Sequence, residues 1–331
     1  LAAIATISDM MELKDYNREI VRLALKDFET NDYPAIRLLA GEEKIDEQII
    51  SIVIAPKVNA IGRVVESTQV NRLVQYFTTP NEEERKLIFQ MIVEGNDRRK
   101  EWTKKACETL VIDDNEAAIV AISDQKEGLI GLIANRLLQQ YNKPVIIFAY
   151  SEELGVLKGS ARSKNGFSIM EAFQELKPYF IVSGGHALAG GCSIKKEAFE
   201  DFKNAFIDYA KLHPITEGKK EAIQLSLDEI TVQNYEIYRS LAPYGVGFEA
   251  PQFEVDGLQV SSLSFISKGE HIMTPISMKT KLVGFHINQS SLSNFKTIDI
   301  FGNMKMKQQH LGVTAPFLYG IAVALAAFVL V

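Results

Sequence analysis

The chain has 331 residues, 47% of them hydrophobic and 24% charged, so it can bury a large core and we expect two or three globular domains. Its formal net charge of -6 excludes a protein that coats nucleic acid with its whole surface, because phosphate binding needs clustered Lys and Arg, but a local basic groove is compatible with it. Cys107 and Cys192 match no metal-ligand spacing and no signal peptide opens the chain, which indicates reduced thiols in a cytoplasmic protein.

The first residues, "LAAIATI", start without Met and are typical of the interior of a buried strand or helix, so we expect the chain to be a piece of a longer protein. Asp9 leaves this apolar run in "ATISDMMEL". A carboxylate at the end of a buried element is costly unless it is paired, hydrogen-bonded or bound to a cation. Two interpretations stay open: Asp9 is a metal ligand, or it caps the next helix.

Residues 16 to 40 place apolar side chains at helical spacing, which predicts two helices around "NDYP". The stretch "APKVNAIGRV" then sets Asn59, Gly62 and Arg63 in order, either as an anion contact or as a surface turn.

Thr79 and Glu82 have capping-box spacing, with Pro80 at the first helical position, and predict the start of a long helix. The second half of that helix gathers basic residues that form either a solvated face or a nucleic-acid contact: Arg98, Arg99, Lys100, Lys104 and Lys105.

From residue 111 strands and helices alternate, which predicts an α/β domain ending near His213, before the polar linker "HPITEGKK". We expect strands at "AAIVAI", "KPVIIFAY" and "GVLKGSARS", and helices at "EGLIGLIANRLLQQY", "SIMEAFQELKPYF" and "KKEAFEDFKNAFIDYAKL". Beyond the linker, short strands at "AIQLSLDEI", "PQFEVDGLQVSSLSFIS", "TKLVGFHI" and "TIDIFGNM", with a helix at "VQNYEIYRSLAPYG", predict a small β-barrel or sandwich.

Two glycine-rich stretches, "KGSARSKNG" and "SGGHALAGG", carry candidate chemistry. Glycines such as Gly184 and Gly185 let an anion approach main-chain N–H groups, because no Cβ stands in the way. Arg162 offers a planar fork of donors to a phosphate, and His186 can donate a hydrogen bond or a proton to a phosphodiester oxygen. The alternative is a tight turn beside a packed core histidine.

The last stretch, "APFLYGIAVALAAFVLV" (residues 315 to 331), is uncharged and close to the shortest length that spans a bilayer. A tail anchor, a buried helix and foreign sequence joined to the chain all fit this composition. We expect no membrane insertion, because the run contrasts abruptly with the polar "KMKQQH" before it.

Taken in order, "ATISDMMELKDYNR", "APKVNAIGRV", "EGLIGLIANRLLQQYNKPVIIFA", "GSARSKNGFSIMEAF", "SGGHALAGG" and "LAPYGVGFEAPQF" resemble the carboxy-terminal portion of the RecJ family, within the DHH phosphoesterase superfamily. The resemblance implies an α/β fold in which the end of a DHH-type catalytic domain is followed by a long connecting helix, a DHH-associated domain and a small OB-type β-barrel. The implied boundaries are 1–78, 79–110, 111–213 and 221–306, with 307–331 an unmatched apolar tail.

The family hydrolyses single-stranded DNA from 5′ to 3′ with two manganese (Mn²⁺) or magnesium (Mg²⁺) ions, in recombination and repair. By resemblance, Asp9 is the last aspartate ligand of those metals, and His186 acts in catalysis. The implied substrate-binding residues are Asn59, Gly62, Arg63, Arg162, Gly184, Gly185 and His186. The barrel is expected to stack bases on aromatic rings, for which Tyr244, Phe248, Phe265 and Phe285 are available. For most of these four rings we expect core packing instead, because a small barrel needs large apolar residues.

The chain contains no Asp-x-Asp pair and no Asp-His-His triplet, which supply the other metal ligands in the family. One carboxylate cannot hold two cations, so we expect the 331 residues by themselves to be inactive. "QKEGLIG" also lacks the aromatic, histidine or proline expected near Lys126, which leaves a direct role of that turn open.

Two alternatives stay open: a noncatalytic module that binds single-stranded nucleic acid, and a DHH phosphodiesterase acting on oligoribonucleotides or cyclic dinucleotides, a group without the barrel. The expected partners are single-stranded DNA, a single-strand-binding protein and a helicase.

Overall fold

The structure is a computed structural model that describes residues 1–64, 70–164, 166–216, 221–276, 280–284, 287–307 and 317–323. The chain divides into two compact units, and each is described by itself. One unit comprises Phe28–Gly218, and the other combines Leu1–Asp27 with Lys219–Val331. The domain boundaries given above stay predictions.

The unit Phe28–Gly218 begins with helices. They are α3 (Pro34–Ala40), α4 (Glu47–Ile49), a π-helical turn (Ile50–Ile54), α5 (Ala55–Val64), α6 (Asn71–Thr78) and the long α7 (Glu82–Thr109). Pro34 occupies the first turn of α3, where a missing N–H costs nothing. Helix α5 packs along α7.

The expected capping box at Thr79 is wrong. Helix α7 is capped by Asn81, whose side-chain oxygen accepts the N–H groups of Glu83 and Glu84. Asn81 is extended and the next residue is helical, so the cap falls two residues after Thr79. Thr79 instead donates its hydroxyl to the Glu84 carboxylate.

A five-stranded sheet follows, with the order β1-β2-β3-β5-β4. Its strands are β1 (Ile119–Ser123), β2 (Val145–Ser151), β3 (Val156–Arg162), β4 (Phe180–His186) and β5 (Ala189–Lys195). Strands β1 and β2 are parallel and the others pair antiparallel. The alternating strands and helices predicted from residue 111 are confirmed, whereas "SGGHALAGG" forms a hairpin within the sheet and is not just a turn between packed elements.

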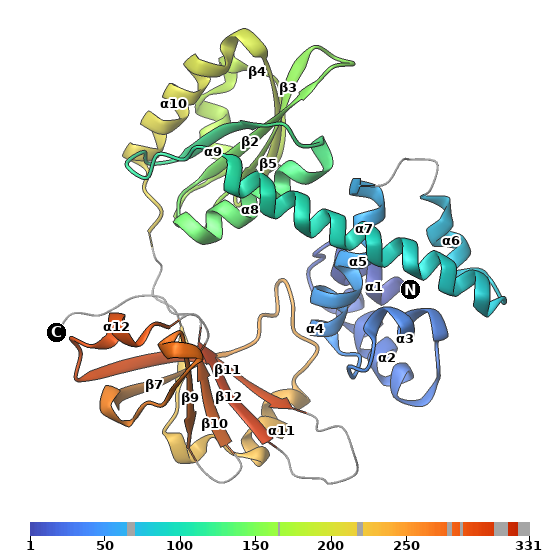
Figure 1. Ribbon diagram of the computed structural model, residues 1–331, viewed down its shortest axis with the longest axis vertical. Helices are drawn as coiled ribbons and strands as arrows, with labels where there is room; N and C mark the ends of the chain where they lie inside the picture. The colour runs from blue at the N-terminus through green and yellow to red at the C-terminus, as the bar shows by residue number, and fades with distance from the viewer. Residues whose placement is uncertain are drawn as a thin grey trace. The chain divides into compact units, whose positions relative to one another are not determined.

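Helices cover both faces of this sheet (Figure 1). Helix α8 (Glu127–Tyr141) packs on alternate residues of β1 and β2, and α9 (Ile169–Glu175) with α10 (Phe199–Leu212) packs on the other face. Strand β4 lies at the sheet edge and is exposed from Ile181 to His186. One part of the sheet therefore remains open on the α8 side.

The second unit joins α1 (Ala2–Ser8) and most of α2 (Asp15–Thr30) to a seven-stranded sheet. In spatial order the strands are β6 (Ala222–Gln224), β7 (Gln252–Gln259), β11 (Thr297–Lys307), β12 (Phe317–Val323), β10 (Thr280–Gly284), β9 (His271–Pro275) and β8 (Phe265–Ile266). Helices α11 (Val232–Ser240) and α12 (Gln289–Leu292) contribute Tyr238 and Leu292 to the core of this sheet. In the described ranges of both units, 3-10 turns occur at Lys177–Tyr179, Lys196–Ala198, Leu227–Glu229, Val260–Ser262 and Ser267–Gly269.

The OB-type sheet is confirmed, but it does not close into a barrel, since β6 and β8 stay at opposite edges of the strand order among the described residues. Residues 317–323 form strand β12, so a helix through this part of the apolar tail is wrong: its backbone groups pair with β10 and β11. Residues 308–316 and 324–331 lie outside the described residues. No helix in the described ranges has the length and apolar character needed to cross a membrane.

Candidate nucleic-acid interface

Arg63 and Arg162 meet at the first turns of helix α8. Arg63, in the last turn of α5, donates through Nη1 to the carbonyl oxygen of Gly128 over 3.1 Å. A Cβ on Gly128 would lie 3.1 Å from both the Cα and the carbonyl oxygen of Arg63, so this glycine allows the two helices to approach. A Cβ on Gly131 would lie 2.9 Å from Nη2 of Arg162, so that glycine leaves room for the guanidinium.

Arg162 is oriented by its own strand. Its Nη1 donates to Ser160 Oγ over 3.0 Å and to the carbonyl oxygen of Ala161 over 2.7 Å. Burial lowers the pKa of Arg162, and the neighbouring charge of Arg63 lowers it further. An arginine remains protonated under such a shift, so the arrangement concentrates positive charge.

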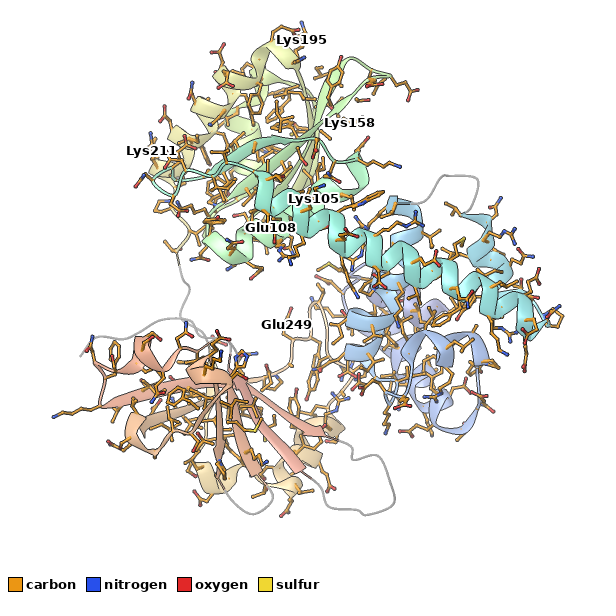
Figure 2. All side chains as sticks on the ribbon, viewed as in Figure 1. Lys105, Glu108, Lys158, Lys195, Lys211 and Glu249 are labelled. Atoms are coloured by element: carbon orange, nitrogen blue, oxygen red, sulfur yellow. The ribbon has the colours of Figure 1, made fainter. Side chains whose placement is uncertain are left out.

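Two carboxylates on the helices of this site pair with lysines. Glu127, at the start of α8, pairs with Lys158 of β3 over 2.9 Å; Lys158 is labelled in Figure 2. Asp97 pairs with Lys100 on α7 over 3.3 Å. Within the part of the chain that the structure describes, neither Arg63 nor Arg162 forms an ion pair with a carboxylate, so the site has a positive charge that an anion can neutralise.

His186 lies on the same face of the sheet as Arg162. Arg162 of β3 is directly opposite Ala189 of β5, and Ala189 is directly opposite His186 of β4. Residues directly opposite one another share a face, and two such steps separate the Cα atoms of Arg162 and His186 by about 10 Å. His186 is exposed at the end of the edge strand, so the alternative interpretation of a packed core histidine is wrong.

Glycines form the floor between these side chains. In the next row of the sheet, Ser160 is opposite Gly191 and Gly191 is opposite Gly184. Both glycines are exposed, and a Cβ on Gly184 would meet no atom within 4 Å. The α8 face of β4 and β5 is therefore flat beside Arg162 and can admit a bulky ligand to the backbone.

At Gly185, the backbone conformation and close backbone contacts require glycine. Its φ is +148°, and a Cβ there would lie 2.4 Å from the carbonyl oxygen of Ala189 and 2.5 Å from the Cα of Gly190. Gly190 in turn leaves room for the rings and methyls of Phe173 and Ile169 on α9. The hairpin backbone and its packing on α9 thus require Gly185 and Gly190 whether or not a ligand binds.

Asn59 and Gly62 lie within helix α5, so a surface turn at "APKVNAIGRV" is wrong. Asn59 is half-buried one turn before Arg63. Gly62 is exposed, and a Cβ there would meet nothing within 4 Å, so the fold places no demand for glycine at this position. The π-helical turn just before α5 is a feature often found at functional sites.

Asp9 is the C-cap of α1 and is exposed, and it belongs to the other unit. It does not cap the next helix, because α2 begins only at Asp15. Among the described residues, the one group of three clustered carboxylates is Glu254, Asp256 and Asp299, without Asp9. The residues present therefore do not fit a two-metal centre at Asp9, since such a centre needs several carboxylates.

Tyr244 and Phe248 contact other side chains of the same unit, as core packing predicts, although Phe248 keeps 37% of its surface exposed. The Arg18 guanidinium lies 3.7 Å from the Phe248 ring centroid, and Phe248 stacks on Tyr244 at 5.9 Å and 8°. Tyr244 is buried and also stacks on Tyr238. Phe265 packs against the core of the seven-stranded sheet, and Phe285 lies outside the described residues.

These aromatic rings belong to a clasp that we define as Leu13 and Arg18 with the loop 241–248. The Leu13 N–H donates to the Val246 carbonyl oxygen over 2.6 Å. Arg18 donates to the carbonyl oxygens of Pro243, over 2.7 Å, and Leu241. The clasp attaches the amino-terminal helices to the OB-type sheet within one unit.

The interpretation from sequence named Arg99 only as one of five basic residues on its helix, and it assigned no role to Gly128 and Gly131. Burial and the charge of Arg63 lower the pKa of Arg99, which places Arg99 within electrostatic reach of the same site. The glycines at the start of α8 were visible in "EGLIG", but only the contacts with Arg63 and Arg162 reveal that they make room for arginines.

Two domain families match the chain. The DHHA1 domain matches residues 114–212, and the RecJ OB domain matches residues 222–310. Among curated proteins, the single-stranded-DNA-specific exonuclease RecJ of Bacillus subtilis (strain 168) is 27% identical over 327 residues, which cover 93% of this chain and 42% of that protein. RecJ of Thermus thermophilus is 27% identical over 280 residues, covering 82% of this chain and 40% of that protein.

Solved structures give the same fold. The Thermus thermophilus RecJ structure with Mg²⁺ aligns with a TM-score of 0.80 at 22% identity, covering 97% of this chain and 50% of that one. The structure of exonuclease RecJ bound to manganese aligns at 26% identity with a TM-score of 0.51, covering 64% of this chain and 54% of that one. The chain thus spans less than half the length of the curated relatives named here.

Proposed function

Because this chain belongs to the RecJ family, through its DHHA1 and OB domains, we propose that it carries the DNA-holding part of a metal-dependent exonuclease specific for single-stranded DNA. One observation carries the proposal: Arg63 and Arg162 converge without a carboxylate partner, in the described residues, beside an open glycine floor that leads to His186. This arrangement matches a polymer whose repeating charge is a phosphate.

Each side chain has a distinct role in this proposal. The forked guanidinium groups of Arg63 and Arg162 bind phosphate oxygens, with Asn59 and Gly62 lining the approach along α5. His186 donates a hydrogen bond to the phosphate, or a proton during cleavage, from the far side of the floor. Gly184 admits the strand to the backbone, and Gly185 holds the hairpin in shape.

The sugar-phosphate backbone is the natural ligand of such a surface, because arginines and main-chain groups read charge and not base identity. On the OB-type sheet, the described face around Glu254, Asp256 and Asp299 is acidic and would repel phosphates. We therefore assign that face no DNA contact.

The metals of the activity would be Mn²⁺ or Mg²⁺, the ions named with the related RecJ structures. Such ions supply an activated water and stabilise the leaving oxygen. By resemblance Asp9 would supply one carboxylate, but among the described residues it belongs to no group of three possible ligands, so the other ligands would have to come from outside this chain. We accordingly propose that the chain alone binds single strands and does not cleave them.

The polarity from 5′ to 3′, the role in recombination and repair, a cytoplasmic location, and contacts with a single-strand-binding protein and a helicase are proposed from the family resemblance alone. A noncatalytic module for single-stranded nucleic acid is the second candidate, favoured by the absence of Asp-x-Asp and Asp-His-His from the sequence. The match of residues 222–310 to the RecJ OB domain disfavours a phosphodiesterase of small nucleotides.

The test measures binding and cleavage with one labelled substrate. The chain is incubated with Mn²⁺ and an end-labelled single strand, and retention and products are followed together; a blunt duplex is the control. We expect retention of the single strand without products. No retention at low salt would contradict the proposal, and degradation by the pure chain would show that the assignment of the missing ligands is wrong.

Variants then locate the surface. Arg162→Ala is expected to weaken single-strand binding about tenfold, because it removes a charged phosphate contact. Arg136→Ala removes the same charge from an exposed position later on α8 and is the matched control. Equal affinities for the two variants would place the DNA elsewhere.

A further inference from the structure

Arg99, in the middle of α7, has one edge of its guanidinium group fixed by a neighbouring side chain. Its Nε and Nη2 both donate to the side-chain oxygen of Asn96, over 3.2 and 3.0 Å. Asn96 is only 4% exposed, so it cannot turn away easily. The remaining Nη1 of Arg99 makes no hydrogen bond within the described residues, and the guanidinium is therefore held by one edge with the other edge available.

Arg99 also shares its surroundings with the two arginines described above. Helix α5 packs along α7 and against α8, which brings the Arg63 end of α5 to both helices. The charge of Arg63 lowers the pKa of Arg99 and of Arg162 alike, after burial as the larger cause. Val64 of α5, Ala106 of α7 and Leu129 of α8 belong to one buried cluster, so the end of α5 that carries Arg63 packs against both other helices.

This cluster of three arginines, Arg63, Arg99 and Arg162, has no internal neutralisation. No ion pair joins any of them to a carboxylate in the described ranges, while Asp97, two residues before Arg99, pairs with Lys100. Partly buried like charges repel, and burial strengthens that repulsion. An anion that contacts all three guanidinium groups relieves this repulsion. Exposed basic residues on a solvated helix face need no such anion, because water already screens their charges.

We infer that Arg99 is a third phosphate-binding residue, contributed by the connecting helix α7, and that Asn96 is the positioning residue that aims it. The inference rests on the proposed function and deepens it: the strand's phosphate is held by α5, α7 and β3 together. Of the five basic residues on the second half of α7, Arg99 is the one that is half-buried, whereas Arg98, Lys100, Lys104 and Lys105 are exposed.

Arg99→Gln is the test variant, because glutamine keeps an N–H donor for Asn96 and removes the charge. Arg98→Gln is the matched control: it makes the same change on the exposed neighbouring residue of the same helix. Affinity for fluorescent oligo(dT) is measured by anisotropy over a range of salt concentrations, with both variants made in the full chain.

We expect Arg99→Gln to weaken oligo(dT) binding about tenfold at low salt and to lower the slope of log affinity against log salt by about 0.7, the value for one phosphate contact on a single strand. Oligo(dA) should show the same loss, because the contact is to phosphate. Arg98→Gln should keep the slope of the unmodified chain. An unchanged slope for Arg99→Gln, or equal losses for the two variants, overturns the inference.

A second measurement separates this inference from the proposed function. Inorganic phosphate, compared with chloride at matched ionic strength, is expected to raise the Tm of the unmodified chain, and Arg99→Gln should lose most of that rise. A phosphate-dependent rise that needs Arg99, without any binding of oligo(dT), would refute the DNA proposal and leave the arginine site standing. If Arg99→Gln binds oligo(dT) normally and shows the full phosphate-dependent rise in Tm, the role of Arg99 is refuted and the DNA proposal stands.

Discussion

The guanidinium of Arg162 occupies the space that a side chain on Gly131 would need: a Cβ there would lie 2.9 Å from Nη2 and 3.0 Å from Ser160 Oγ. A helix residue thus decides where an arginine of the sheet points.

Gly131→Ala should therefore displace Arg162 and weaken single-strand binding severalfold, although alanine favours the helix itself by up to about 1 kcal/mol. Anisotropy with oligo(dT) measures the first effect, and urea unfolding measures the second. Gln140→Ala, at an exposed position of the same helix, is the control. If Gly131→Ala binds oligo(dT) with unchanged affinity, the Arg162 guanidinium does not bind DNA from the position that it occupies in this structure.

Gly184 and Gly185 make a matched pair with opposite expected outcomes. Gly184→Ala should fold normally, because a Cβ there meets nothing within 4 Å, but its methyl group narrows the proposed DNA approach and should weaken binding. Gly185→Ala should destabilise the fold by about 1–3 kcal/mol, because φ is +148° and the Cβ would strike the Ala189 carbonyl. Urea unfolding and oligo(dT) affinity, measured on both variants, check the pair; equal stability losses would contradict it.

Arg18→Ala should release the clasp. It removes hydrogen bonds to the carbonyl oxygens of Pro243 and Leu241 and the contact with the Phe248 ring, and we expect a loss of about 1–3 kcal/mol. Limited proteolysis should then cut the segment between α1 and α2 sooner. Arg22→Ala, which removes an exposed ion pair with Glu19 on the same helix, is the control and should change neither the stability nor the proteolysis rate appreciably. Similar effects of the two variants would show that the clasp does not stabilise this unit.

The free energy of unfolding should fall as the pH rises above about 9. Burial raises the pKa of the Cys192 thiol from 9.0 to about 12, and it also raises the pKa of the buried Tyr76 hydroxyl, which donates to the Ala35 carbonyl. The folded state keeps these protons while the unfolded state loses them, so unfolding becomes easier from pH 9 toward 12.

Urea titrations at pH 7, 9 and 10 measure how the free energy of unfolding depends on pH. Cys192→Ala should reduce the decrease that begins near pH 9. Iodoacetamide at neutral pH should modify the half-buried Cys107 before Cys192 in the folded chain. Faster labelling of Cys192 would show that its thiol is not buried.

Local pattern was sufficient for most elements between residues 111 and 213. The run "EGLIGLIANRLLQQY" coincides with α8, and the β-branched run "KPVIIFAY" contains β2, because helix and strand periods are written in neighbouring residues. Arg63, Arg162 and His186 were also identifiable from sequence as candidates, since arginine and histidine beside glycine are suited to anion binding. The cap at Asn81 was missed because Thr79 has the same cap chemistry and only backbone conformation distinguishes the two.

What the sequence by itself determined is most of the elements between residues 111 and 213, the resemblance to RecJ, and the absence of the Asp-x-Asp and Asp-His-His ligands from this chain. Tertiary structure alone decided that Arg63 and Arg162 meet over Gly128 and Gly131, that Asn96 holds the half-buried Arg99, and that the Arg18 guanidinium lies over the Phe248 ring. The physical reason is distance along the chain: these contacts join residues tens to hundreds of positions apart, and their geometry is set by close packing of helices and strands that no local periodicity encodes.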